Sequence, residues 1–428
     1  MTIQEKAAQM KLDSPKLAAT PAKVRDHALE LIAQALLSHK NEILGANARD
    51  LQTAEQDGVS AQVMKRLRFD EHKLTDVIRG IHDLIALPDP LARIQLKREL
   101  DSDLLLERVS CPIGVIGVIF EARPDALVQI ASLCLKSGNC VILKGGSETM
   151  HTNRCLFALI HQAAVKGGLP ESCMFQAEAR SEINELLSCH ESVDLLIPRG
   201  SNAFVRYIME HSQIPVMGHS DGICHIYVDK DADIAKAIPV IVDAKSQYTA
   251  ACNAAETLLI HRDIADALLP PLYQALRDAK VEVRGTQEIR RLIDCLPAKE
   301  EDFSTEYLDL IISIKLVDSI EEAIDHINRY GSHHTDAILT ENADAAEQFM
   351  RYVDSAGVYQ NCSTRFADGF RYGFGAEVGI STGKLHARGP VGLEGLCTYK
   401  YQLFGNGNIV GDYASGIRQF HFQDLDVE

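Results

Sequence analysis

The sequence has no apolar run long enough to span a membrane, because the longest candidates are broken by Gly or polar residues within about ten positions. The first residues, Met1 to Lys11, are polar and lack the apolar centre of a secretory signal peptide. We therefore expect a cytoplasmic protein. With 46% apolar and 24% charged residues, the 428 positions are typical of a globular chain of two or three domains.

Paired cysteines and an excess of basic residues are also missing. The 11 cysteines are an odd number with no C-x-x-C pair, which argues against a disulfide framework and against a zinc site. His333, His334 and Asp336 could imitate metal ligands, but adjacent histidines do not easily aim at one centre, and we predict no metal. The net charge of −17 argues against nucleic acid as a partner. An anionic small molecule remains possible, since a local pocket of cations and backbone N–H groups can bind phosphate.

The fingerprints G-x-G-x-x-G and G-x-x-x-x-G-K-[ST] are absent as well. Strands and helices nevertheless alternate from Pro112 onward, which predicts doubly wound α/β domains. Two strands are followed by a loop that offers a cation, backbone N–H groups and a hydroxyl at a helix start, which suits a phosphate at the carboxyl ends of the strands. These loops are Lys144-Gly145-Gly146-Ser147 and Arg199-Gly200-Ser201. Glycine after a strand is also a plain turn residue, so either loop alone would be a weak signal.

Before this region, helical spacing predicts helices between about Lys16 and Asp57 and from Glu71 to Leu87. The segments 94–100 and 104–109 then flank a polar turn and predict a hairpin. An exposed hairpin edge needs a partner, and a sister subunit is the natural candidate, so we expect a homo-oligomer. The expected domains are a dinucleotide-binding domain (1–93 and 112–221), an oligomerisation arm (94–111 with about 396–428) and a catalytic domain (222–395).

The stretch from Gln247 to Ile260 places one thiol, Cys252, in a loop among small residues, just before an apolar run that predicts a buried strand. Small neighbours leave space beside the sulfur for a carbonyl carbon. Cysteine is suited to covalent catalysis near neutral pH because part of it is already thiolate. Most cysteines in such a chain are small buried hydrophobes, however, so the loop alone does not decide the matter.

Four motifs resemble the aldehyde dehydrogenase superfamily and, more narrowly, its branch that reduces a glutamyl phosphate in proline biosynthesis. They occupy residues 218–229, 252–257, 326–338 and 368–382, and the resemblance covers almost the whole chain. It implies two doubly wound α/β domains with a β-hairpin oligomerisation arm. It also implies NADPH-dependent reduction of L-glutamyl 5-phosphate, the product of a glutamate 5-kinase, to L-glutamate 5-semialdehyde through a cysteine thioester.

The resemblance also assigns roles to particular residues. Cys252 matches the family's nucleophile, and Lys144 matches the lysine that contacts the adenosine ribose of the cofactor. Gly200 and Ser201 match the pyrophosphate loop, and Glu306 matches the acid near the nicotinamide ribose. Nothing near Lys144 distinguishes NADPH from NADH physically, although a cation there could favour a 2′-phosphate.

For the substrate, charge type and loop position suggest further roles. Arg123 and Arg388 could pair with its anionic groups, Glu121 with its ammonium, and His219 with the leaving phosphate. Exposed ion pairs are common and nearly neutral in energy, so these arginines could equally form surface salt bridges.

Two departures from the wider superfamily favour a reductase. Hydrolytic members have a Trp-Asn pair where this chain has Glu121-Ala122, and a Glu near the place of His219 that activates water against the thioester. A reductase has no use for that base, because water would destroy the intermediate before hydride arrives. Without the Asn, the backbone N–H of Cys252 and the side chain of Asn253 are the expected oxyanion donors. The alternatives are a reductase for another acyl phosphate, a hydrolytic aldehyde dehydrogenase, or a catalytically silent scaffold of the same fold.

Overall fold

The computed structural model describes residues 2–178 and 182–427, and the chain divides into two compact units. Unit 1 comprises Met1–Met217, Phe374–Gly379 and Val391–Glu428, and unit 2 comprises Gly218–Gly373 and Ile380–Pro390. The first border therefore lies four residues before the one expected from the sequence, and the hairpin arm belongs to unit 1. Among the described residues, no helix combines the length and the hydropathy needed to cross a bilayer.

Unit 1 contains a four-stranded parallel sheet with the strand order β5-β4-β3-β6. Its central strand β3 is apolar apart from one glycine and is buried at every position, as expected of a strand covered on both faces. The strands are β3 (Val115–Phe120), β4 (Cys140–Gly145), β5 (Met174–Ala177) and β6 (Leu195–Arg199).

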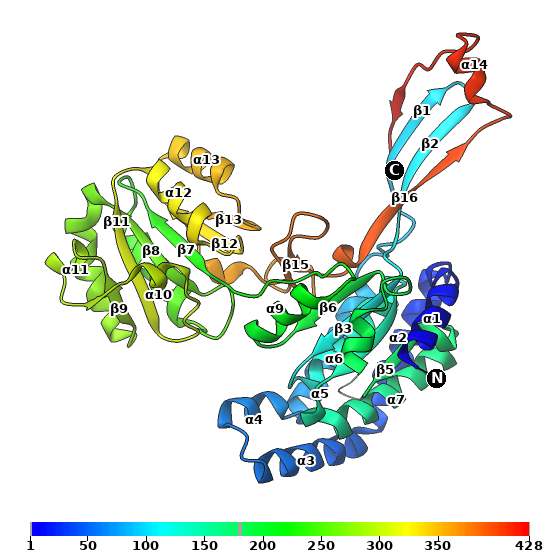
Figure 1. Cartoon of the computed structure of the whole chain (residues 1–428), viewed down its shortest axis with the longest axis horizontal. Helices are drawn as coiled ribbons and strands as arrows, with labels where there is room; N and C mark the ends of the chain where they lie inside the picture. The colour runs from blue at the N-terminus through cyan, green and yellow to red at the C-terminus, as the bar shows by residue number, and fades with distance from the viewer. Residues whose placement is uncertain (1, 179–181, 428) are drawn as a thin grey trace. The chain divides into compact units, whose positions relative to one another are not determined.

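Helices pack around this sheet (Figure 1). They are α1 (Ile3–Ala18), α2 (Ala22–Ser38), α3 (Lys40–Gln56), α4 (Ala61–Leu67), α5 (Glu71–Ala86), α6 (Pro124–Lys136), α7 (Met150–Lys166), α8 (Glu182–Leu187) and α9 (Asn202–His211), with the 3-10 turns η1 (Ser147–Thr149) and η2 (Glu171–Cys173). The helices predicted over 16–57 and 71–87 correspond to α2, α3 and α5. The helix α1, which begins at a capping box on Thr2, was not predicted apart from its last three residues.

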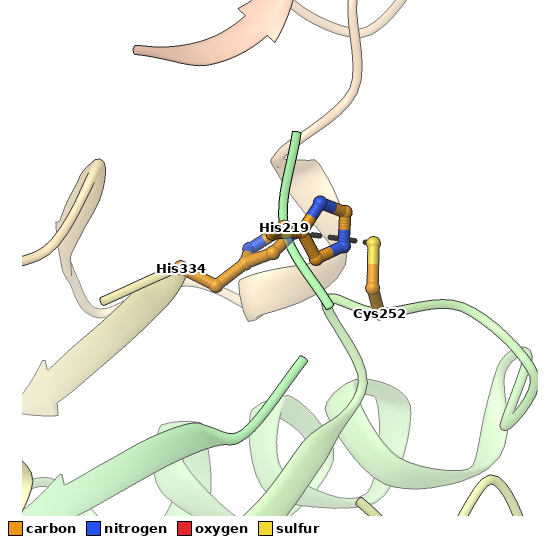
Figure 2. Close-up of side chains that lie close together, drawn as sticks. All are labelled: His219, Cys252 and His334. Atoms are coloured by element: carbon orange, nitrogen blue, oxygen red, sulfur yellow. Dashed lines mark hydrogen bonds between the residues drawn. The ribbon is translucent and has the colours of Figure 1, made fainter. Parts of the chain in front are cut away.

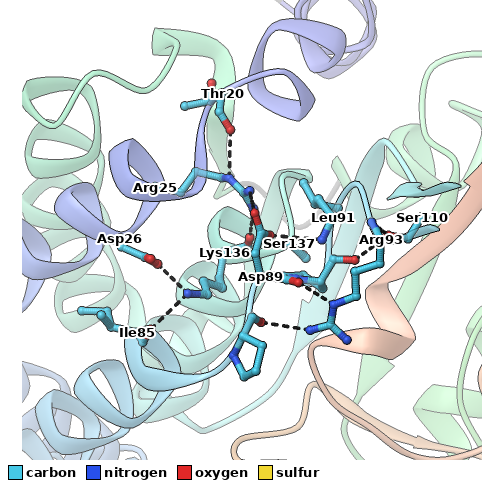
Figure 3. A network of polar contacts seen from close by, with 12 residues as sticks. Thr20, Arg25, Asp26, Ile85, Asp89, Leu91, Arg93, Ser110, Lys136 and Ser137 are labelled. Atoms are coloured by element: carbon cyan, nitrogen blue, oxygen red, sulfur yellow. Dashed lines mark hydrogen bonds and ion pairs between the residues drawn. The ribbon is translucent and has the colours of Figure 1, made fainter. Parts of the chain in front are cut away.

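A buried arginine ties the helices of unit 1 to the base of the arm (Figure 3). The Arg25 side chain is 2% exposed, and it donates to the Thr20 carbonyl at 3.1 Å, to the Asp89 carboxylate at 2.7 Å and to the Lys136 carbonyl. The Lys136 ammonium in turn bonds the Ile85 carbonyl at 3.2 Å and forms an ion pair on α2. The network fixes the segment that leads into the hairpin, because a buried charge is stable only when it is paired.

The arm is a four-stranded antiparallel sheet, drawn in cyan and red in Figure 1. The predicted hairpin is present as β1 (Ile94–Asp101) and β2 (Leu104–Pro112), and C-terminal strands cover both of its edges. These strands are β16 (Cys397–Phe404) on β2 and β17 (Gln423–Leu425) on β1, with η6 (Glu394–Leu396) and α14 (Val410–Ala414) beside them. Along β16, Tyr399, Tyr401 and Leu403 are about half exposed, so pairing with a sister subunit stays a prediction.

Unit 2 is built on a seven-stranded parallel sheet with the order β10-β9-β11-β8-β7-β12-β13. The strands are β7 (Cys224–Val228), β8 (Ala255–His261), β9 (Glu282–Gly285), β10 (Leu296–Pro297), β11 (Ile311–Val317), β12 (Thr335–Leu339) and β13 (Gly357–Gln360). The helices and turns are α10 (Ile234–Ser246), α11 (Arg262–Asp278), α12 (Ile320–Tyr330), α13 (Ala343–Tyr352), η3 (Ile289–Arg291), η4 (Glu300–Ser304) and η5 (Thr364–Phe366).

The helices of unit 2 lie on both faces of the sheet, and β7, β8 and β12 are buried throughout. A ribbon of β14 (Gly379–Ser381) and β15 (Gly389–Val391) lies where the chain passes between the units. The predicted doubly wound architecture is confirmed.

Candidate active site

Three loops of unit 2 bring a thiol and two imidazoles together (Figure 2). Cys252 precedes β8, His219 lies on the segment that leads into β7, and His334 stands directly before β12. Because β8, β7 and β12 are neighbours and run parallel, the loops that enter them meet at one edge of the sheet. The thiol therefore lies at the amino ends of the strands, opposite to the edge where ligands usually bind in such sheets.

Cys252 and His334 form a hydrogen-bonded pair. The distance from the Cys252 sulfur to His334 Nε2 is 3.1 Å, the thiol is half-buried, and the imidazole is 1% exposed. His334 Nδ1 contacts the Thr335 hydroxyl at 2.9 Å. If Nδ1–H donates to this hydroxyl, Nε2 is left to accept the thiol proton, and the proton can move from sulfur to nitrogen with no other rearrangement. The pair has the arrangement of a nucleophile and its general base.

His219 packs against His334 and also lies near the thiol, with one ligand atom from each of the three side chains within 4.8 Å of the other two. The two ring centroids are 5.0 Å apart in an edge-to-face arrangement. His219 Nδ1 lies 3.0 Å from the carbonyl of Ile380, and since a carbonyl only accepts, Nδ1 carries a proton. In the neutral ring the lone pair is then on Nε2. The side chain expected to meet the leaving phosphate thus lies beside the thiol.

The loop that carries the thiol is held by close contacts. A Cβ at Gly222 would overlap the backbone carbonyl of Cys252, so only glycine allows this approach. The Asn253 amide donates to the Ala367 carbonyl at 2.8 Å, and the Thr364 hydroxyl donates to the Asn253 carbonyl at 2.7 Å. Asn253 is 3% exposed. It therefore anchors the loop, and its role as an oxyanion donor stays a prediction.

Arg365 places a guanidinium near the thiol. The residue is 8% exposed, and Nε donates to the Gln247 side chain at 3.0 Å. Burial lowers the pKa of Arg365 and the neighbouring Arg371 adds to this effect, whereas the negative charge of a Cys252 thiolate raises it. The sequence offered no role for this residue, because its approach to Cys252 depends on a loop more than a hundred positions away.

The two loops predicted to bind phosphate lie side by side in unit 1. Lys144 and Gly145 of β4 and Arg199 of β6 pair with the last residues of β3, so both loops leave the same carboxyl edge. Lys144 is 4% exposed, its ammonium donates to the Gly145 carbonyl at 2.7 Å, and burial lowers its pKa. Ser147 opens the turn η1, and Ser201 caps α9.

Carboxylates of unit 1 accept hydrogen bonds from two backbone amides, one in the second of these loops and one directly after β3. Glu121 accepts from the backbone N–H of Ser201 at 3.0 Å, and Glu148 accepts from that of Ala122 at 2.6 Å. A Cβ at Gly200 would overlap the Glu121 carboxylate, and one at Gly146 would overlap Glu148. These contacts show that the amide of Ser201 points into a space that accepts an anionic oxygen. Glu121, expected at the substrate ammonium, has a backbone amide as its partner here.

The structure does not bring the other residues expected at the site, Arg388, Arg123 and Glu306, together. Arg388 bonds the Asp354 carboxylate at 3.2 Å and the Thr382 carbonyl at 3.1 Å in unit 2. Arg123 is exposed at the start of α6. Glu306 is partly buried and raises the pKa of Glu256 by its charge. The sequence missed His334 as the partner of the thiol, although its position directly before a buried strand, like that of Cys252, was a usable signal.

The fold and a thiol placed before a strand define a class of protein, the aldehyde dehydrogenases, and a sequence model described as the aldehyde dehydrogenase family matches residues 2–289. Gamma-glutamyl phosphate reductase of Acetivibrio thermocellus is 55% identical over 428 residues, which is 100% of this chain and 99% of the relative. Gamma-glutamyl phosphate reductase 1 of Synechocystis is 56% identical over 94% of this chain and 93% of the relative. A solved gamma-glutamyl phosphate reductase from Thermotoga maritima matches with a TM-score of 0.92 and 40% identity, covering 95% of this chain and 99% of that one. The chain therefore belongs to the aldehyde dehydrogenase family and, within it, to the gamma-glutamyl phosphate reductases.

Proposed function

We propose that this protein reduces L-glutamyl 5-phosphate to L-glutamate 5-semialdehyde and phosphate, with NADPH as reductant, in proline biosynthesis. The names of the full-length relatives support the substrate. The observation that carries the chemistry is the 3.1 Å contact between the Cys252 sulfur and His334 Nε2. A half-buried thiol beside an imidazole nitrogen that can take its proton is suited to attack an activated carbonyl.

In the first half of the reaction, His334 Nε2 accepts the proton of Cys252, and the sulfur attacks the acyl carbon. A carbon–sulfur bond forms, the bond from that carbon to the phosphate oxygen breaks, and a thioester remains. The proton held on His334 is available to the leaving phosphate. Arg365 is the cation that we assign to the negative charge of the substrate at this step, since it already lies within electrostatic reach of the sulfur.

In the second half, a nicotinamide cofactor held by the residues described below would supply hydride chemistry at the thioester carbon. The carbon–sulfur bond then breaks, the aldehyde leaves, and the Cys252 thiolate recovers a proton from solvent. His219 stands near the sulfur where a hydrolytic member of the family would carry a carboxylate base. An imidazole whose Nδ1–H is tied to the Ile380 carbonyl is held in place, and we assign its Nε2, when it carries a proton, to the leaving phosphate as a hydrogen-bond donor.

The residues of unit 1 fit a dinucleotide. Gly146 and Gly200 lack the Cβ that would overlap the carboxylates of Glu148 and Glu121, and the amide of Ser201 at the start of α9 already donates to an anionic oxygen. Lys144 and Arg199 supply positive charge at the same edge of the sheet. These groups would hold the pyrophosphate and the adenosine ribose, and Lys144 would favour a 2′-phosphate. Glu306 remains our candidate for the nicotinamide ribose.

The test is NADP⁺ reduction by the purified enzyme with L-glutamate 5-semialdehyde, which should require inorganic phosphate. Aspartate semialdehyde and NAD⁺ should support much slower turnover. Cys252→Ala should lower kcat by several orders of magnitude, whereas Cys362→Ala, a partly buried thiol of the same unit, should be nearly unchanged. Phosphate-independent oxidation would instead identify a hydrolytic aldehyde dehydrogenase, and full activity of Cys252→Ala would refute the thioester.

A further inference from the structure

We infer that Cys252, His219 and His334 bind a soft divalent cation such as Zn²⁺, and that this cation blocks the nucleophile. One ligand atom from each side chain lies within 4.8 Å of the other two. Among the described residues, this is the only group of three or more His, Cys, Asp or Glu side chains that meets this distance. The sequence pointed away from a metal because it suggested His333 and His334 as neighbours, whereas the structure pairs His334 with His219.

The donor set suits zinc better than other common cations. One thiolate and two imidazoles are ligands that zinc prefers, and three protein ligands leave a fourth position open for water. Magnesium and calcium require oxygen ligands, which this cluster does not offer. Affinity for divalent ions at nitrogen and sulfur sites also rises toward the end of the first transition series, so Co²⁺ is a weaker but usable substitute.

The imidazoles already have the outer contacts of metal ligands. His219 Nδ1 donates to the Ile380 carbonyl, and His334 Nδ1 contacts the Thr335 hydroxyl. Such contacts fix the ring orientation and leave Nε2 as the donor atom. The Cys252 sulfur and His334 Nε2 are 3.1 Å apart. In a tetrahedral site with the usual zinc–ligand bond lengths, two ligand atoms are about 3.3–3.6 Å apart (the edge of the tetrahedron), so the observed separation is close to this value. His219 is partly exposed on a loop and needs to approach by no more than about 1.5 Å, the difference between 4.8 Å and that edge.

Occupation of this site would stop the proposed chemistry. The cation would hold the sulfur lone pair that must attack the acyl carbon, and it would take the Nε2 atom that must accept the thiol proton. It would also shield the thiol from oxidation, because a metal-bound thiolate is a weaker nucleophile than a free one. The cation is thus an inhibitor rather than a cofactor, and its binding does not depend on the identity of the substrate.

The experiment uses the full-length chain, without a purification tag and after removal of metals, titrated with Co²⁺. Tetrahedral Co²⁺ bound to a thiolate gives intense visible bands and a charge-transfer band in the near ultraviolet. We expect these bands to saturate at one equivalent, to vanish on addition of one equivalent of Zn²⁺, and to be absent in Cys252→Ser. His219→Ala and His334→Ala should each weaken Zn²⁺ binding at least about tenfold, in line with the known sensitivity of such sites to their ligands and outer contacts.

Matched controls are His333→Asn, the neighbouring histidine, and Cys362→Ser, another partly buried thiol of unit 2, both of which should bind like the parent. Circular dichroism checks that each variant is folded, and because two histidine variants are tested, a folding defect in one leaves the other informative. Bands that persist in Cys252→Ser, or Zn²⁺ affinity unchanged in both histidine variants, would overturn the inference. The optical readout needs no turnover, so it can succeed or fail independently of the proposed reductase activity. In a second measurement, Zn²⁺ should abolish activity and a chelator should restore it.

Discussion

Lys245 and Glu256 form an ion pair with no solvent exposure, and the pair joins the two ends of the loop that carries Cys252. Lys245 lies in the last turn of α10, and Glu256 is the second residue of β8. Burial raises the pKa of Glu256 to about 8 against the opposing influence of Lys245, and burial likewise lowers the pKa of Lys245. The pair thus fixes the distance between the end of α10 and the start of β8, and with it the position of the loop that carries Cys252.

Substitution of either Lys245 or Glu256 alone should lower the free energy of unfolding more than substitution of both. Glu256→Gln leaves a buried ammonium without its carboxylate, and we expect a loss of about 3–5 kcal/mol in the free energy of unfolding. Lys245→Met leaves a buried carboxyl without its ammonium, and we expect a loss of stability in the same range, because either group can shed its charge only by a proton change. The double variant should recover most of the loss in stability. Urea unfolding followed by circular dichroism measures these differences.

The exposed pair Lys236–Glu341, also in unit 2 with 3.0 Å between its charged atoms, is the matched control. Its disruption by Lys236→Met should change stability by no more than about 1 kcal/mol. The variants of Lys245 and Glu256 should also have a lower kcat when they are assayed at a low temperature at which they stay folded. The reason is that a displacement of about 1 Å at a nucleophile can cost about a hundredfold in rate. An unchanged kcat in all three variants would remove the positioning role and leave a purely structural one.

His334 should act as the base for Cys252. His334→Gln removes a proton acceptor 3.1 Å from the sulfur, and we expect kcat to fall by about two to four orders of magnitude, the range typical of general bases. The reaction of Cys252 with iodoacetamide should slow in parallel, because no base beside the sulfur takes its proton. That alkylation rate, followed by mass spectrometry of the peptide, reports on the thiol without turnover.

His333→Asn is the control for this prediction. His333 has a φ of 59°, a conformation that asparagine tolerates, and its Nδ1 bonds the Asp354 carbonyl away from the thiol. Its activity and alkylation rate should match those of the parent. If His334→Gln alkylates as fast as the parent, the contact with the sulfur has no role in activation.

Glu121 should compete with the cofactor rather than bind the substrate ammonium. Its carboxylate accepts the Ser201 amide that a pyrophosphate would use. Glu121→Ala should therefore lower KM for NADPH, because an anion no longer occupies the start of α9. KM for the acyl phosphate should change little. The opposite pattern, with only the acyl-phosphate KM raised, would restore the role first suggested by the sequence, and Glu185→Ala on the exposed surface of α8 serves as a charge-matched control.

Local patterns predicted the elements of the fold well. The helix expected from Glu71 to Leu87 is present as α5, and the hairpin strands expected over 94–100 and 104–109 are present as β1 and β2, because apolar periodicity and flanking turn residues are encoded within a few positions. The short helix α4 has only seven residues, too few for a clear apolar stripe, and it was not predicted.

The composition of the site could not be predicted in the same way. Cys252 was a candidate from its own loop and matched the family's nucleophile, but its partner His334 lies 82 residues further on. The two side chains meet because the strands that follow them, β8 and β12, both flank β7 in the sheet. Strand order is a property of the whole domain, and no local pattern in the sequence encodes it. The same reason explains Arg365, which reaches the thiol from the segment after β13.

His326 should make unit 2 sensitive to acid. The ring is 4% exposed, packs edge-on against Phe303 and His225, and finds no hydrogen-bond partner for either nitrogen among the residues that the structure describes. Burial lowers its pKa from 6.5 to about 3, and the positive charges of His225, Lys315 and Arg329 act in the same direction. The unfolded chain therefore binds a proton that the folded chain resists, so this contribution is complete above pH 6.5 and is lost as the pH falls toward 3. Between about pH 7.5 and about pH 5 the free energy of unfolding should fall by about 2 kcal/mol, and His326→Phe should abolish this loss.

Hydrogen exchange of peptides from α12 at the two pH values, corrected for intrinsic rates, measures the difference locally. His190→Gln, which changes an exposed histidine of unit 1, should leave the difference unchanged. Equal pH dependence in the parent and in His326→Phe would show that another group controls the acid response.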